Sequence, residues 1–176
     1  MGKTKGSAVI AAVKLLRSRR PEAQELLPAP LLHYLDERIV VAAWYPEEDL
    51  LALIRACAGV FPARGESIFE SMGAAGARNH MEGIYADLMG REPSARAHAL
   101  WRTQHDTGEL RVAHAAPTSV TYELSDWTLQ AADYCRLLGG YLAEIHRIAG
   151  APDPTFLHPA CRASGARSCV WLVRWS

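Results

Sequence analysis

The sequence predicts an α+β fold in which a helical N-terminal half packs against a β-β-α-β-β antiparallel sheet. Three observations predict it: apolar residues recur at helical spacing up to about residue 105, they alternate as in half-buried strands beyond it, and one long amphipathic segment separates two pairs of strands. The 176 residues contain no long linker or repeat. We therefore expect a single domain over residues 1–176, mainly helical over 1–105 and β-β-α-β-β over 106–176.

The first elements are expected to be helices joined by short connections. Val9, Val13 and Leu16 recur at helical spacing after Gly6. Shorter helices are expected at residues 21–27, where proline occupies the first turn, and at residues 30–37. The β-branched run at residues 39–44 predicts a short strand or an extended connection.

Three further helices are expected before the sheet. Proline and acidic residues begin one at Pro46, and this helix carries Cys57 on its apolar stripe as a small core residue. A long helix is expected from residue 66 to residue 89, with small residues at 73–77 that would let a neighbouring element approach closely. Another begins at Pro93 and carries Leu100 and Trp101.

The second half alternates in the manner of an antiparallel sheet. Strands are expected at residues 110–114 and 120–124, and again at 155–161 and 168–175. Between the pairs lies a helix that Ser125 or Asp126 can cap and that Gly150 ends. Its apolar stripe includes Cys135, which should therefore face the sheet.

Charge and hydropathy exclude several classes of function. Lys plus Arg equals Asp plus Glu at 19 each, so no global positive field would attract nucleic acid or an anionic membrane. Lys14 interrupts the first apolar run, and no run approaches the ~18 residues of a membrane span. We expect a cytoplasmic protein without a membrane span, in which the thiols stay reduced.

One histidine and three cysteines form the main candidate site. In a hairpin centred on Gly165, Cys161 and Cys169 would face each other. His158 could join them if the strand bends at Pro159. Cys135 would then be a fourth ligand from the helix, and a set of three cysteines and one histidine suits zinc. The spacing alone leaves open a pair of core cysteines beside a surface histidine, and a disulfide is disfavoured by the reducing compartment.

Part of this constellation also resembles a known family. Cys135-Arg-Leu-Leu-Gly-Gly-Tyr-Leu-Ala-Glu144, followed by Cys161-Arg-Ala-Ser-Gly165 and Cys169-Val-Trp-Leu-Val173, resembles the 4-vinyl reductase domain family over residues 105–176. That family shares its fold with the sensor domains of phenol-responsive activators, with a vesicle-tethering subunit and, more distantly, with haem-based nitric oxide sensors. Over its whole length the chain is similar to a paralogous group of myxobacterial proteins.

The resemblance implies both a cofactor and a ligand. It implies a structural Zn²⁺ held by Cys135, Cys161 and Cys169, with His158 at the position of the family's glutamate, which makes the set Cys3His. It also implies a homodimer and a buried pocket for a small apolar or aromatic molecule. By location alone, the candidate pocket residues are Trp101, His105, Trp127 and Tyr134.

Three functions remain open at this stage. The first is a small-molecule-binding or sensory module with a structural zinc site, which acts through a partner protein. The second is an interaction or scaffold protein with a filled pocket, and the third, suggested by the family's name, is an enzyme acting on an aromatic or tetrapyrrole substrate. The sequence contains no phosphate-binding glycine loop, no G-x-S-x-G elbow and no H-E-x-x-H motif, so no residue is proposed as catalytic.

Overall fold

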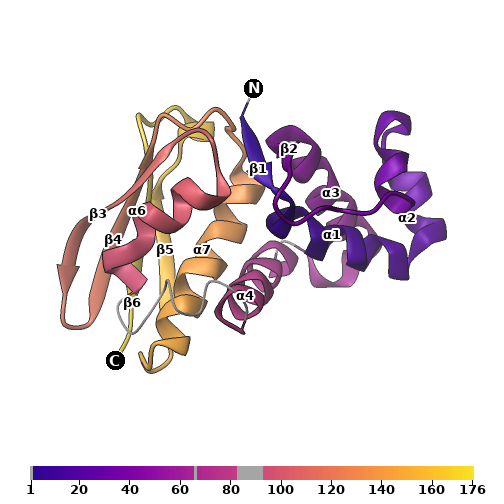
Figure 1. Ribbon diagram of the computed structural model, residues 1–176. Helices are drawn as coiled ribbons and strands as arrows, with labels where there is room; N and C mark the ends of the chain where they lie inside the picture. The colour runs from indigo at the N-terminus through magenta and orange to yellow at the C-terminus, as the bar shows by residue number, and fades with distance from the viewer. Residues whose placement is uncertain (1, 66, 83–92) are drawn as a thin grey trace.

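The structure, a computed structural model, describes residues 2–65, 67–82 and 93–176 and has the expected α+β architecture (Figure 1). A four-stranded sheet lies at one side of the molecule, α7 runs along it, and α4 packs on α7. Helices α1, α2 and α3 form the opposite side. The helices are α1 (Gly6–Ser18), α2 (Arg20–Leu26), α3 (Glu47–Val60), α4 (Ser67–Glu82), α6 (Pro93–Gln104) and α7 (Ala132–Ile148).

The first helices bury the stripe that the sequence predicts. Val9, Val13 and Leu16 are almost completely buried, and so is Cys57 on α3. The segment expected to be a helix at residues 30–37 is instead a 3-10 helix, η1 (Ala29–Leu35). A second short 3-10 helix, η2 (Pro62–Arg64), follows α3.

The β-branched run before α3 forms a strand only at its end. Strand β2 (Trp44–Pro46) pairs antiparallel with β1 (Lys3–Lys5), which the sequence analysis did not predict. Val40 and Val41 are exposed, and residues 39–43 are irregular. These residues remain outside the ladder because β1 is only three residues long and pairs with residues 44–46.

Helices α4 and α7 approach until their backbones touch. A Cβ atom on Gly73 would overlap the carbonyl oxygen of Leu137, and one on Gly140 would overlap that of Glu70. The expectation that small residues on α4 admit a close neighbour is thus confirmed. The part of the predicted helix at residues 83–89 lies outside the described residues.

The sheet has the order β3-β4-β6-β5 and is antiparallel throughout. Helix α7 contacts β5 and β6, so the helix between the two strand pairs covers the sheet as expected. Tyr122, Leu124 and Trp171 are almost completely buried in the core. The strands are β3 (Glu109–Ala116), β4 (Ser119–Ser125), β5 (Thr155–Ala160) and β6 (Cys169–Arg174).

Helix α7 begins later than the sequence suggests. Asp126 does not cap it, because this residue adopts a left-handed conformation with φ of 51°. The loop 126–131 that follows places Trp127 in the core at 1% exposure. The other end is as expected: Ala149 is the C-cap, and Gly150 has φ of 100°.

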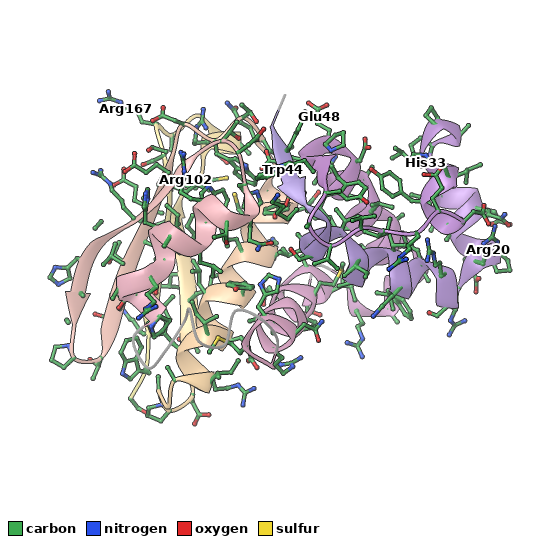
Figure 2. The ribbon with its side chains drawn as sticks, in the orientation of Figure 1. Arg20, His33, Trp44, Glu48, Arg102 and Arg167 are labelled. Carbon is green, nitrogen blue, oxygen red and sulfur yellow. The ribbon has the colours of Figure 1, made fainter. Side chains whose placement is uncertain are left out.

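The exterior carries the charged side chains, except for those of the buried Glu47 and Glu144. Arg167 points outward at the end of the sheet, and Arg20 does so at the far end of the helical half (Figure 2). None of the described helices combines the length and the hydropathy needed to cross a membrane.

Candidate functional site

Three sulfur atoms and one imidazole converge where α7 meets the β5–β6 hairpin. The potential ligand atoms of Cys135, His158, Cys161 and Cys169 all lie within 4.8 Å of one another. Sγ of Cys135 lies 3.6 Å from Sγ of Cys169 and 3.9 Å from Sγ of Cys161. All four cysteines of the chain are unbridged.

The hairpin brings two of the cysteines and the histidine into this cluster. Ala160 of β5 and Val170 of β6 are the last paired residues before the turn of the hairpin. Cys161 directly follows Ala160, and Cys169 directly precedes Val170, so the two cysteines lie next to each other at the start of the turn. The register shifts between Leu157 and Ala160, which confirms the expected bend at Pro159. This bulge brings His158 to the same side as the cysteines, although regular alternation would separate them.

The ring of His158 is oriented as a metal ligand would be. Its Nδ1 lies 2.8 Å from the carbonyl oxygen of Val170, so this nitrogen donates a proton and Nε2 keeps its lone pair. Nε2 is buried and has no hydrogen-bond partner among the described residues. The ring stacks on Trp171 at 4.7 Å, and burial lowers the pKa of His158, which favours the neutral form.

The thiol of Cys135 forms hydrogen bonds with the thiols of Cys161 and Cys169. Either of the Cys135 and Cys169 thiols can donate to the other, and the backbone N–H of Arg162 lies 3.3 Å from Sγ of Cys169. The hydrogen bond with Cys135 and, less strongly, that with the N–H of Arg162 lower the pKa of Cys169. The pKa of Cys135 is raised by its hydrogen bond to Cys169 and by burial.

The distances match a tetrahedral metal ion bound to thiolates. Two sulfurs held at about 2.3 Å from a tetrahedral zinc lie about 3.8 Å apart. The two separations of 3.6 and 3.9 Å fall on either side of this value. Together with the unpaired Nε2 of His158, the donor set therefore fits a zinc ion with four protein ligands.

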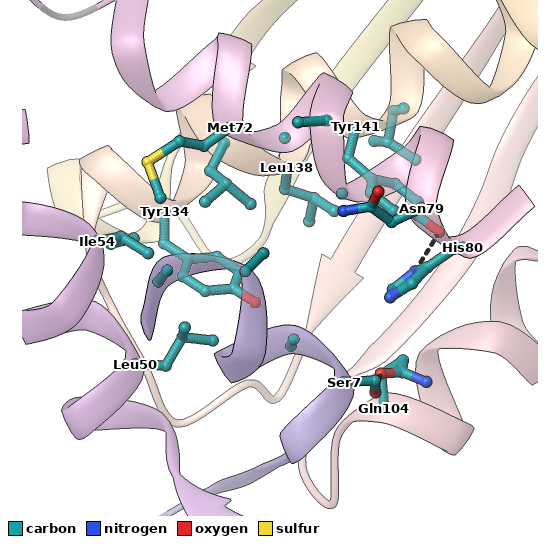
Figure 3. Close-up of a pocket in the computed structure, with 18 of the residues that line it drawn as sticks. Ser7, Leu50, Ile54, Met72, Asn79, His80, Gln104, Tyr134, Leu138 and Tyr141 are labelled. Atoms are coloured by element: carbon teal, nitrogen blue, oxygen red, sulfur yellow. Dashed lines mark hydrogen bonds between the residues drawn. The ribbon is translucent and has the colours of Figure 1, made fainter. Parts of the chain in front are cut away.

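A cavity of about 470 Å³ lies on the side of α7 away from this cluster and is lined by residues of α1, α3, α4, α6 and α7 (Figure 3). Most of its walls are apolar, with Ile54, Met72 and Leu138 among them. Its volume is within the usual range for small-molecule sites. The polar or aromatic residues that Figure 3 labels in its lining are Ser7, Asn79, His80, Gln104, Tyr134 and Tyr141.

Three of the four candidate pocket residues line this cavity: Trp101, His105 and Tyr134. Trp127 lies behind them and packs edge-on against Trp101 at 5.5 Å between ring centroids. Sequence analysis missed the polar residues Ser7, Asn79, His80 and Gln104. Only the tertiary packing of α1, α4 and α6 brings them together, so no local motif marked them.

A buried carboxylate holds the aromatic wall in place. Oε1 of Glu47 accepts hydrogen bonds from Nδ1 of His105 at 2.6 Å and from Nε1 of Trp127 at 2.8 Å. His105 stacks on Trp101 at 4.0 Å. Three segments distant in the sequence, the start of α3, the end of α6 and the loop before α7, are thereby joined.

Comparisons with known proteins identify the fold alone. No family model and no curated protein sequence matches the chain. Among solved structures it is similar to an H-NOX protein from S. oneidensis in the Fe(II)NO state, with a TM-score of 0.67 and 12% identity over 98% of this chain and 99% of that one. An unliganded Fe(II) H-NOX mutant from K. algicida gives a TM-score of 0.67 at 7% identity, covering 98% and 96%. An H-NOX structure concerned with haem distortion gives 0.61 at 11% identity, covering 98% and 95%.

The described lining of the cavity does not fit the haem that this fold holds elsewhere. A haem carries two carboxylates, and the described lining offers one cationic side chain, Lys14. Its two histidines are engaged by the protein: His105 is bound by Glu47 and stacked on Trp101, and His80 lies 3.1 Å from the hydroxyl of Tyr141. An uncharged apolar molecule suits these walls better.

Proposed function

We propose that the chain is a small-molecule-binding or sensory module in which a structural zinc fastens α7 to the β5–β6 hairpin. The observation that carries the proposal is the position of α7 between the two sites. Cys135 on this helix belongs to the metal cluster, while its neighbours Tyr134 and Leu138 line the cavity. A molecule bound in the cavity would therefore contact the same helix that the zinc ion fastens to the hairpin.

The proposed zinc has a structural role. Four protein ligands leave no coordination position for water or substrate, so the ion would stabilise the packing of helix on hairpin without taking part in hydrolysis. Cys135 would come from the helix, and His158, Cys161 and Cys169 from the hairpin. The resemblance to the 4-vinyl reductase family, which rests on the motifs around Cys135, Cys161 and Cys169, supports the same assignment.

A scaffold with a filled pocket is the second candidate function. The 470 Å³ cavity favours ligand binding over this alternative, because a filled interior would leave no such space. No observation favours an enzyme acting on a tetrapyrrole, since the described lining offers one cation for the carboxylates. We therefore propose a non-enzymatic module that signals through a partner protein.

Two further proposals rest on the resemblance and on the cysteine content. The resemblance supports a homodimer, which light scattering coupled to size exclusion would test: a monomer at 0.1 mM would contradict it. The unbridged thiols support a cytoplasmic location, where they stay reduced.

The ligand-binding function is tested by native mass spectrometry of the purified full chain. We expect added masses of small apolar or aromatic molecules, either retained from the host cell or supplied in a screen. The absorption spectrum should lack the Soret band of haem, both as purified and after incubation with haemin. Failure of every apolar molecule to bind would favour the scaffold.

A further inference from the structure

The hydroxyl of Tyr134 projects from α7 into the cavity. Figure 3 shows the ring of this tyrosine among Leu50, Ile54 and Met72, with its hydroxyl turned toward the side of the cavity where His80 lies. The side chain as a whole is 4% exposed. A polar atom is thereby placed among apolar side chains in the interior of the protein.

This hydroxyl is unpaired and yet accessible from the cavity. It has no hydrogen-bond partner among the described residues. The described side-chain atoms that are both unpaired and without accessible surface belong to other residues: Thr4, Arg17, Gln104 and His158. The Tyr134 hydroxyl therefore keeps accessible surface, and in a buried side chain that lines the cavity this surface faces the cavity. Because buried hydroxyls are nearly always paired, it calls for a partner on the molecule that fills the cavity.

Other polar side chains of the lining satisfy each other. The Ser7 hydroxyl donates to Oε1 of Gln104 at 2.6 Å. Nδ1 of His80 lies 3.1 Å from the hydroxyl of Tyr141. These groups are engaged within the protein, whereas the hydroxyl of Tyr134 is available to a ligand.

The charges around the cavity favour an uncharged acceptor on that ligand. Burial raises the pKa of Tyr134, so its hydroxyl keeps its proton and can donate it to a hydrogen bond. The described lining contains no carboxylate, and its one lysine, Lys14, is exposed. His105 is compensated by the buried Glu47. Burial also lowers the pKa of His80 to about 4, which keeps this ring neutral at pH 7. A carboxylate ligand would thus enter without a buried cation to pair with it.

We propose that the cavity binds an uncharged, mainly apolar molecule whose carbonyl oxygen accepts a hydrogen bond from the hydroxyl of Tyr134. Tyr134 directly precedes Cys135, so the ligand would bond to the same turn of α7 that carries a ligand of the proposed zinc. The inference rests on the proposed ligand-binding function and specifies the class of ligand.

A pair of isosteric probes and one conservative variant test it. 2-Acetylnaphthalene and 2-isopropenylnaphthalene differ in a C=O group against a C=CH2 group and have nearly the same shape. Isothermal titration of the full chain gives the dissociation constant of each. The affinity for the ketone relative to that for the alkene should fall about tenfold in Tyr134→Phe, the value of one hydrogen bond to an otherwise unpaired donor.

A measurement on the wild type supports the same assignment without a variant. In infrared difference spectra with a ¹³C-labelled carbonyl, the C=O stretch of the bound ketone should lie below its frequency in hexane. In Tyr134→Phe it should return to the frequency found in hexane.

Tyr122→Phe is the matched control. Tyr122 is also buried, but its hydroxyl bonds to His146 and it does not line the cavity. This variant should unfold at a lower urea concentration than the wild type and keep the ratio of the two affinities. Tyr134→Phe loses no hydrogen bond within the protein, so it should unfold at no lower urea concentration than the wild type.

The outcomes separate this inference from the function on which it rests. An affinity ratio that is the same in the wild type and in Tyr134→Phe, or an unshifted C=O stretch in the wild type, would overturn the role of Tyr134 and leave the cavity as a binding site. Absence of binding by either naphthalene to the folded wild type would overturn the ligand-binding function as well.

Discussion

Replacement of Glu47 is the sharpest test of how the aromatic wall of the cavity is held. This carboxylate is 1% exposed, and one oxygen accepts from both His105 and Trp127. Glu47→Ala leaves two buried N–H donors without an acceptor, at about 1–3 kcal/mol each, so the free energy of unfolding should fall by about 4 kcal/mol. Glu47→Gln keeps one acceptor oxygen, but it loses the charge and puts an NH2 group in place of Oε2, which lies 3.4 Å from the Thr128 hydroxyl, so it should cost about 1–2 kcal/mol.

Equilibrium denaturation in urea at fixed zinc concentration measures both changes. Glu48→Ala is the control, because Glu48 lies on the same first turn of α3 and points to solvent (Figure 2). It should change stability by no more than about 0.5 kcal/mol. The reasoning is refuted if Glu47→Gln is as destabilising as Glu47→Ala, or if Glu47→Ala matches the control.

Three further predictions concern the packing of α4 against α7, the pH dependence of stability, and Cys57, the cysteine outside the metal cluster. Gly140→Ala should lower stability by about 1–3 kcal/mol, because its Cβ overlaps the carbonyl oxygen of Glu70; an unchanged melting temperature would contradict this close packing. Burial lowers the pKa of His146, whose Nε2 accepts the Tyr122 hydroxyl, to about 4. Only the unfolded chain then binds a proton between pH 6.5 and about 4, so stability should fall through this window as the pH falls, by up to about 3 kcal/mol. His146→Gln should make this fall smaller, while the part due to His80, whose pKa is also lowered to about 4, remains, and parallel profiles would disprove the assignment. Cys57→Ala should leave the zinc content unchanged, because Cys57 lies in the core with its thiol 3.6 Å from the carbonyl of Ala12; loss of metal from this variant would count against the four-ligand site.

Sequence reasoning located correctly the elements whose buried face is set by the spacing of apolar residues along the chain itself. Val9, Val13 and Leu16 lie on one stripe, and the stripe is buried. Cys135 was expected to face the sheet, and it is 1% exposed. In both cases the helical period alone decides which residues face the interior. The bend at Pro159 was equally predictable, since proline cannot donate to the ladder.

The elements that it missed depend on distant partners or on unusual backbone conformation. Strand β2 forms at Trp44–Pro46 because β1, about forty residues earlier in the chain, pairs with it. Asp126 takes a left-handed conformation in place of capping α7, and this directs Trp127 into the core. Gln104 reaches the cavity only through the packing of α6 against α1, so nothing in its neighbours along the chain identified it.

The central claim is that a structural zinc joins α7 to the β5–β6 hairpin, and metal analysis of the purified full chain tests it most directly. We expect about one zinc per folded chain in the wild type and in Cys57→Ala. We expect little zinc in Cys161→Ser and a markedly lower affinity in His158→Ala. A folded wild type that contains well under one equivalent of zinc, after purification with zinc supplied, would contradict the claim.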